Sequence, residues 1–157
     1  MYPCFDIDGI SSARLLREWS WLAPGEFALL AVNAFGDLFL QDIHGSVLRL
    51  DVTAGKISAI AGSSIEFREA AKDAGKKRDW FLEQRAEQAE KNGCSPGKGQ
   101  CVGAKMPWVF SESATMPENM YIADLYEHVS FMGDLHRQTN DVPDGGKVRI
   151  RVPPCPE

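Results

Sequence analysis

Residues 27–60 read FALLAVNAFGDLFLQDIHGSVLRLDVTAGKISAI and contain four short segments with strand character. These segments cover residues 27–33, 38–43, 47–52 and 56–60. The first is nearly continuously apolar, which is typical of a strand buried on both faces, and the third alternates apolar and charged side chains. The connections at residues 44–46 and 53–55 have the length and the turn residues of hairpins. We therefore predict an antiparallel meander of four strands.

Helical sequence lies on both sides of this meander. The expected helices cover residues 11–21, 65–74, 79–92 and 124–138. Ser63 and Glu66 have the spacing of a capping box, and Asp124 is a natural N-cap of the last helix. His136 continues the apolar stripe of that helix, so we expect a partly buried, hydrogen-bonded ring. Residues 147–152 alternate strictly, which predicts a strand solvated on one side. The expected fold class is α+β, a single domain in which an antiparallel meander is packed by three to four helices.

The composition excludes several classes of protein. The chain has 157 residues, with 17 Lys and Arg against 22 Asp and Glu, a formal net charge of −5. One domain is the natural count for this length, and the acidic balance argues against non-specific binding to nucleic acid or to a membrane surface. No apolar run approaches the ~20 residues that span a bilayer, and residues 1–9 lack the features of a signal peptide. We therefore expect a cytoplasmic protein with reduced cysteines.

Two motifs resemble those of proteins that bind or transfer phosphate groups, but the surrounding sequence argues against both assignments. Residues 5–9, FDIDG, look like the nucleophile motif of haloacid-dehalogenase-type phosphatases, but the few preceding residues, including Pro3, cannot form the buried strand that this motif requires. Residues 93–99, GCSPGKG, look like a phosphate-binding loop, but Gly99 stands where a Walker A loop needs a hydroxyl. A helix that ends at Gly93, followed by a surface loop, explains the second motif better.

Metal and catalytic sites are also poorly supported. Cys94 and Cys101 lack the Cys-x2-Cys spacing that grips one zinc ion. Asp124 and His128 lie one helical turn apart, so a helix face with metal ligands can be drawn. No nucleophile, base and orienting group can be selected together. We therefore expect a protein that is not an enzyme and that holds no cofactor and no metal.

Several further motifs follow one another along the chain. They begin with NAFGDLFL at residues 33–40, followed by Asp42, Gly45 and Leu50-Asp51. They continue with IEF at 65–67, Trp80, GQC at 99–101, Glu118-Asn119, GDLH at 133–136, Gln138 and PDG at 143–145. This series resembles the DUF1851 family, the C-terminal domain of type VI secretion immunity proteins of the Tdi1 type. The resemblance covers residues 26–152, with residues 1–25 as an N-terminal helical extension and residues 153–157 as a C-terminal tail.

The resemblance implies a small α+β immunity protein that binds and neutralises a cognate antibacterial toxin in the cytosol. For the named members of the family that toxin is a DNase. An acidic domain can meet a basic nuclease face with fast, steered association. The candidate partner-binding residues are Trp108, Asp37 and Asp42. Trp108 follows Pro107 in an irregular segment, where we expect an exposed aromatic side chain that can contact a partner.

Two alternatives belong to other functional classes. One is a binding module for a small ligand or for another bacterial protein, including a homodimer, which would use an apolar patch near Trp108 or a pocket under the last helix. The other is a metal-assisted hydrolase that would use Asp37, Asp42 or the face formed by Asp124 and His128. The metal content of the purified protein separates the hydrolase from the two binding functions.

Overall fold

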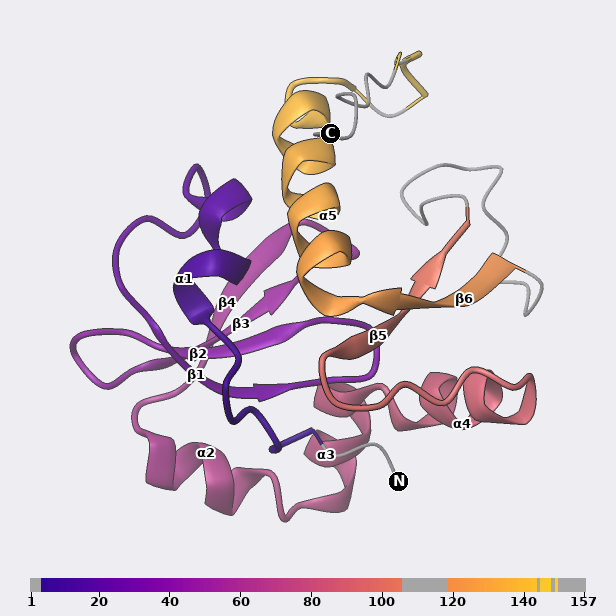
Figure 1. Cartoon of the computed structure of the whole chain (residues 1–157). Helices are drawn as coiled ribbons and strands as arrows, with labels where there is room; N and C mark the ends of the chain where they lie inside the picture. Colours follow the sequence, from indigo (N-terminus) through magenta and orange to yellow (C-terminus); the bar gives the residue numbers. More distant parts are fainter. Residues whose placement is uncertain (1–3, 106–118, 144, 148, 150–157) are drawn as a thin grey trace.

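Four antiparallel strands form the central sheet in a computed structural model, which describes residues 4–105, 119–143, 145–147 and 149 (Figure 1). The strands are β1 (Ala28–Val32), β2 (Leu38–Gln41), β3 (Val47–Asp51) and β4 (Lys56–Ala61). They pair in the order β1-β2-β3-β4, so the predicted meander is confirmed. The burial predicted for the first strand is confirmed for its second half, where Ala31 and Val32 are buried in the cores on opposite faces of the sheet, whereas Ala28 is exposed. An apolar run does not reveal which neighbours cover it.

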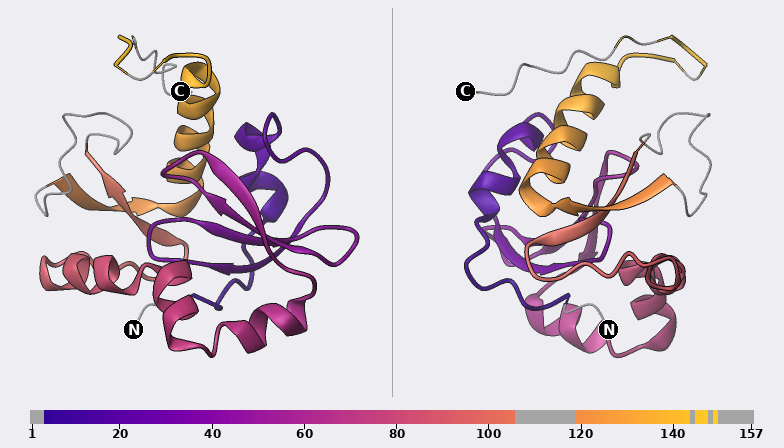
Figure 2. Two further views of the ribbon diagram at one scale, coloured as in Figure 1. Left: turned by 180° about the vertical axis from the view of Figure 1, so that it is seen from behind. Right: turned by 45° about the vertical axis from the view of Figure 1, so that its right-hand side comes forward.

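Alternate side chains of the central strands face two separate cores. The helices are α1 (Ser12–Leu15), the 3-10 helix η1 (Arg17–Trp19), α2 (Ser64–Ala70), α3 (Ala74–Phe81), α4 (Glu83–Lys91) and α5 (Leu125–Thr139). On one face of the sheet, Leu38, Leu40 and Leu50 pack under α1, η1 and α5. On the other face, Phe39 and Val47 pack against α2 and α3. Figure 2 shows the sheet between these two helical layers. The protein is therefore a single α+β domain, as the sequence predicts.

Helix α2 starts as predicted but ends at Ala70, and α3 starts at Ala74, earlier than the predicted residue 79. Ser63 Oγ accepts the Glu66 N–H at 3.1 Å, as in a capping box, and Glu66 Oε2 accepts the Gly62 N–H at 2.9 Å. The helix predicted at residues 79–92 is divided between α3 and α4 by Leu82, which has a left-handed conformation with φ of 49°. Periodicity alone does not reveal such a break, because a leucine seldom adopts this conformation.

The segment that precedes β1 is part of the core. Leu15 and Trp19 are fully buried among side chains of the sheet and of α5. Trp19 Nε1 donates a hydrogen bond to Val129 O at 2.8 Å. The helix predicted at residues 11–21 is shorter in the structure, since only α1 and η1 are helical there. These contacts anchor α5 on the first face of the sheet.

A two-stranded ribbon extends from the end of the sheet. Its strands, β5 (Gln100–Ala104) and β6 (Met120–Asp124), are antiparallel, and the Val102 N–H donates to Ala34 O in the β1–β2 turn at 2.7 Å. A third core lies between this turn, α4 and the ribbon. Of the strand predicted at residues 147–152, Lys147 and Arg149 are not in a strand, and the other positions lie outside the described residues. In the described part of the chain, no helix is long and apolar enough to cross a membrane.

Candidate binding site

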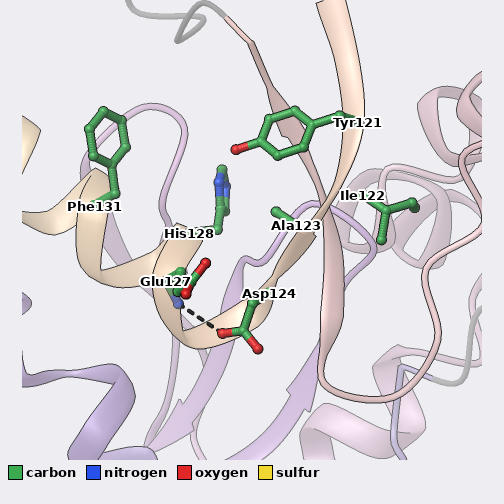
Figure 3. A pocket seen from close by; sticks show the side chains of 7 residues that line it. All are labelled: Tyr121, Ile122, Ala123, Asp124, Glu127, His128 and Phe131. Atoms are coloured by element: carbon green, nitrogen blue, oxygen red, sulfur yellow. Dashed lines mark hydrogen bonds between the residues drawn. The ribbon is translucent and has the colours of Figure 1, made fainter. Parts of the chain in front are cut away.

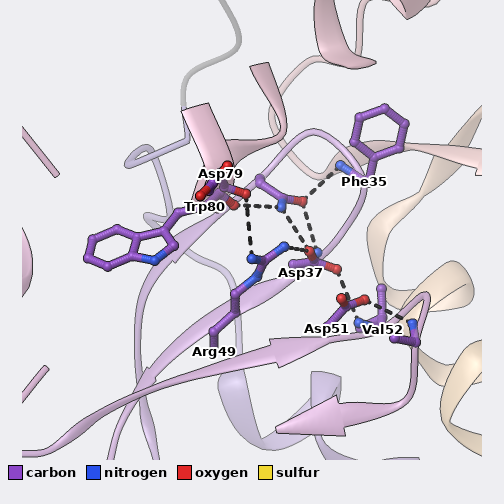
Figure 4. A network of polar contacts seen from close by, with 9 residues as sticks. Phe35, Asp37, Arg49, Asp51, Val52, Asp79 and Trp80 are labelled. Carbon is purple, nitrogen blue, oxygen red and sulfur yellow. Dashed lines mark hydrogen bonds and ion pairs between the residues drawn. The ribbon is translucent and has the colours of Figure 1, made fainter. Parts of the chain in front are cut away.

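The side chain of Asp37 lies at the centre of a buried polar network (Figure 4). Its carboxylate accepts hydrogen bonds from Arg49 Nη2 at 2.9 Å and from Asn33 Nδ2 at 3.0 Å. The second oxygen accepts the Val52 N–H at 3.1 Å. Asn33 Nδ2 also donates to Trp80 O at 3.1 Å. The network therefore joins the β1–β2 turn to β3 and to α3.

These contacts make Asp37 a structural residue. It is 1% exposed, and both carboxylate oxygens are engaged. Burial, together with the charge of Asp51, raises the pKa of Asp37, and Arg49 and Asn33 oppose that shift. The prediction that Asp37 contacts a partner is wrong, because a side chain without exposed surface cannot reach another protein. Its ion-pair partner lies on a different strand, and no local sequence pattern reveals that pairing.

The other two predicted partner-binding residues have different outcomes. Asp42 stabilises the β2–β3 hairpin, since its Oδ1 accepts the N–H groups of His44 and Ser46, each at 2.9 Å. It remains partly exposed, so its role in binding stays a prediction. Trp108 lies outside the described residues.

The two phosphate-like motifs have structural explanations. Residues 5–9 form no strand, and Asp6 makes an ion pair with Lys98 Nζ at 2.9 Å. Gly93 ends α4 with φ of 83°, and a loop follows, as predicted. The first segment therefore lacks the preceding strand of a phosphatase motif, and the second lacks the following helix of a Walker A loop.

The candidate metal ligands do not come together. Within residues 4–105 and the described part of 119–149, no three His, Cys, Asp or Glu side chains are grouped as a metal site requires. Cys101 is fully buried, and burial raises the pKa of its thiol. His136 is buried, and its Nε2 lies 3.1 Å from both Val52 O and Thr53 O. The predicted hydrogen-bonded histidine is therefore confirmed.

A pocket of about 250 Å³ lies where β6 meets α5 (Figure 3). It is lined by Tyr121, Ile122, Ala123, Asp124, Glu127, His128 and Phe131. Asp124 connects the two elements without a loop, since it is both the last residue of β6 and the N-cap of α5. Its Oδ1 accepts the Glu127 N–H at 3.0 Å, as predicted for an N-cap aspartate. In the rest of this article this site is called the β6–α5 pocket.

The His128 ring forms the buried wall of the β6–α5 pocket. The residue is 8% exposed, and a Cβ atom added to Gly36 would lie 3.2 Å from its Cδ2, so one edge of the ring packs against the β1–β2 turn. A Cβ atom added to Gly103 would lie 3.3 Å from His128 Nδ1 and 3.0 Å from Tyr121 Cε1, so both rings pack over that glycine. Burial lowers the pKa of His128 to about 4, and the backbone of Phe35 partly opposes this shift. The ring is therefore neutral at pH 7.

Negative charge and aromatic surface meet at the mouth of the pocket. Asp124 and Glu127 are exposed, and among the described residues no lysine or arginine lines the pocket. Tyr121 is 42% exposed and Phe131 is 39% exposed, two of the few large apolar side chains that reach the surface of the described chain. Figure 3 shows the His128 ring between these two aromatic rings, with the Tyr121 hydroxyl turned towards it. The arrangement suits recognition of a positively charged, partly apolar group.

Sequence reasoning identified only part of this site. The helix face formed by Asp124 and His128 was recognised, but as a set of metal ligands, and Glu127 and Phe131 extend the same face by spacings of three and four residues. Tyr121 could not be added, because its position depends on the pairing of β5 with β6 across residues 105–119. No local pattern predicts a pairing over such a distance.

Comparison with known proteins supports the fold and no specific activity. No protein-family model matches the chain, and no curated protein sequence matches it. Among solved structures, the chain is similar to the crystal structure of Atu4351 from Agrobacterium tumefaciens, with a TM-score of 0.54 and 15% sequence identity. The match covers 69% of this chain and 54% of that chain, so the protein spans about half the length of this neighbour. At this identity the likeness concerns the fold alone.

Proposed function

We propose that this protein is a non-catalytic immunity-type protein that binds and neutralises a cognate antibacterial toxin of a type VI secretion system. The observation that carries this proposal is the β6–α5 pocket, where two exposed aromatic rings and two carboxylates lie together. Aromatic side chains of this kind are the usual anchors of protein–protein interfaces. The series of motifs that resembles the DUF1851 family supplies the class of partner.

The shape and charge of the protein support a macromolecular partner. The pocket is smaller than the ~300–1,000 Å³ typical of small-molecule sites, so it suits one side chain of a larger partner. The formal net charge of −5 favours a basic partner and fast association with it. A nuclease is the toxin class that the resemblance implies, and its nucleic-acid-binding face would be basic.

Co-expression with the toxin encoded beside this gene tests the proposal. We expect the two proteins to co-purify as a stable complex and expect cells that express both to grow, whereas cells that express the toxin alone do not. A toxin with a substituted catalytic residue serves as the control, because it should still co-purify without affecting growth. The proposal is wrong if no neighbouring toxin binds and deletion of the gene leaves cells insensitive to attack by sister cells.

A further inference from the structure

We propose that the outer edge of β4 pairs antiparallel with the same strand of a second copy of this chain. The inference goes beyond the proposed function, because it concerns a different surface from the β6–α5 pocket and needs no toxin. Three features of the strand carry it: its open edge, the lack of charge along that edge, and the complementarity of its sequence to itself.

The outer edge of β4 is open in the described part of the chain. β1 and β4 are the two edges of the central sheet, and the edge of β1 is partly occupied, since the Val32 N–H donates to Cys4 O at 2.8 Å. β4 pairs with β3 on one side and contacts α2, but among the described residues no strand pairs with its other side. An open edge presents a row of N–H and C=O groups to which another strand can pair.

The middle of β4 lacks the features that protect natural edge strands. The strand reads KISAIA, with no charged residue and no proline after Lys56. The register shift that leaves Ile60 without a partner on β3 falls near its last residue. Between these two positions, Ile57, Ser58 and Ala59 form a regular, uncharged stretch, in which Ser58 and Ala59 are exposed. Charges, prolines and bulges are the usual means of preventing pairing, so this stretch is free to pair.

The uncharged stretch is complementary to itself when two copies run antiparallel. With Ser58 opposite the Ser58 of the second copy, Ile57 lies opposite Ala59 and no charged side chains face each other. Hydroxyl groups opposed in this way form hydrogen bonds across the strands. The two Lys56 residues are then four residues apart along the pair, about 14 Å, so they repel each other little.

The symmetry of this contact favours a dimer over a longer assembly. Two identical strands that pair antiparallel are related by a twofold axis, so each copy uses the same surface and the assembly closes at two chains. Ile65, at the start of α2, is 74% exposed and adds apolar surface close to the end of β4. A contact of this size belongs to the weak class of interfaces, and we expect a dissociation constant on the order of 0.1 mM.

Sedimentation equilibrium of the full chain tests the inference directly. The protein concentration is varied from about tenfold below to about tenfold above the expected dissociation constant. We expect the weight-average mass to rise from that of one chain towards that of two chains, and not beyond. A mass that stays at one chain throughout this range, or that rises past two chains, would overturn the inference.

Substitutions at the edge localise the contact. Ser58→Lys places two ammonium groups opposite each other, and Ala59→Lys adds a cation to the same stretch. Each change should weaken self-association at least about tenfold, because like charges opposed across strands are destabilising and edge lysines prevent pairing. Both residues are exposed, so the single chain should keep its fold, which circular dichroism checks. Gln88→Lys, which adds the same charge at an exposed position of α4, is the matched control and should self-associate like the natural protein.

An equal loss in the Gln88 variant, or no loss in either edge variant, would contradict the assignment of β4.

Hydrogen exchange of the β4 amides separates the possible occupants of the edge. We expect the N–H groups of residues 57–60 that point away from β3 to become protected as the protein concentration rises. Protection that is the same at every concentration would show that another part of the same chain covers the edge. Protection that arises only when a toxin is added would show that the partner protein occupies it. Either result overturns the pairing of two copies, and the second leaves the proposed function in place.

Discussion

Acidification should destabilise the protein through His128, and the size of the effect follows from the structure. Burial lowers the pKa of His128 from 6.5 to about 4 in the folded protein. The unfolded chain therefore binds one more proton than the folded chain between these two values. The stability that the neutral ring contributes is fully present above pH 6.5 and is lost as the pH falls towards 4. At 1.36 kcal/mol per pKa unit, the loss is about 2 kcal/mol at pH 5 and about 3 kcal/mol at pH 4.

Urea unfolding followed by tryptophan fluorescence at pH 7 and pH 5 measures this loss. The His128→Gln variant cannot titrate at this position, so its free energy of unfolding should fall by about 2 kcal/mol less than that of the natural protein. His44→Gln, at an exposed histidine of the β2–β3 hairpin, is the matched control. Burial also lowers the pKa of His136, but this residue contributes equally to the pH dependence of stability in all three proteins. The reasoning is refuted if His128→Gln loses as much stability as the natural protein.

Two further predictions concern the buried network and the glycines. Asp37→Asn leaves Arg49 without its charged partner and should lower the free energy of unfolding by about 3–5 kcal/mol. The double variant that also carries Arg49→Met should lose less stability than the sum of the two single variants. Additive losses, measured by urea unfolding, would contradict the ion pair. Gly55→Ala places a Cβ atom 2.6 Å from the His136 ring, whereas Gly93→Ala, also at positive φ, has nothing within 4 Å. Both variants carry backbone strain, but only Gly55→Ala should lose an additional ~1–3 kcal/mol of folding stability, because its Cβ atom overpacks the core. Equal melting temperatures of the two variants would contradict this prediction.

Local patterns were sufficient to predict most of the fold. The hairpin turns, the alternation in residues 47–52 and the apolar stripe of α5 each involve neighbours in sequence, and all of these predictions were confirmed. The break at Leu82 was missed because the pattern on both sides of it is helical. The exposed start of β1 was not predicted, because an apolar run does not show which of its side chains the neighbouring elements cover.

The site was harder to predict than the fold, for a physical reason. The Asp37–Arg49 pair connects a turn to a neighbouring strand, and the β6–α5 pocket needs β5 and β6 to pair. Contacts of this kind depend on the assembled tertiary structure. Charged residues are usually exposed, so the burial of Asp37 is not expected from the sequence. The helix face that contains His128 was visible in the sequence, but its aromatic and acidic neighbours give it a different chemistry from the metal site that was considered.

The direct junction of β6 and α5 at Asp124 has a consequence for the kinetics of binding. One wall of the pocket continues into the other without a flexible connection, and the Asp124 cap fixes the angle between them. Domain or loop closure is therefore not needed to form the pocket. Preorganised surfaces of this type associate without a slow conformational step. Substitutions at the pocket should then change the lifetime of a complex much more than its rate of formation.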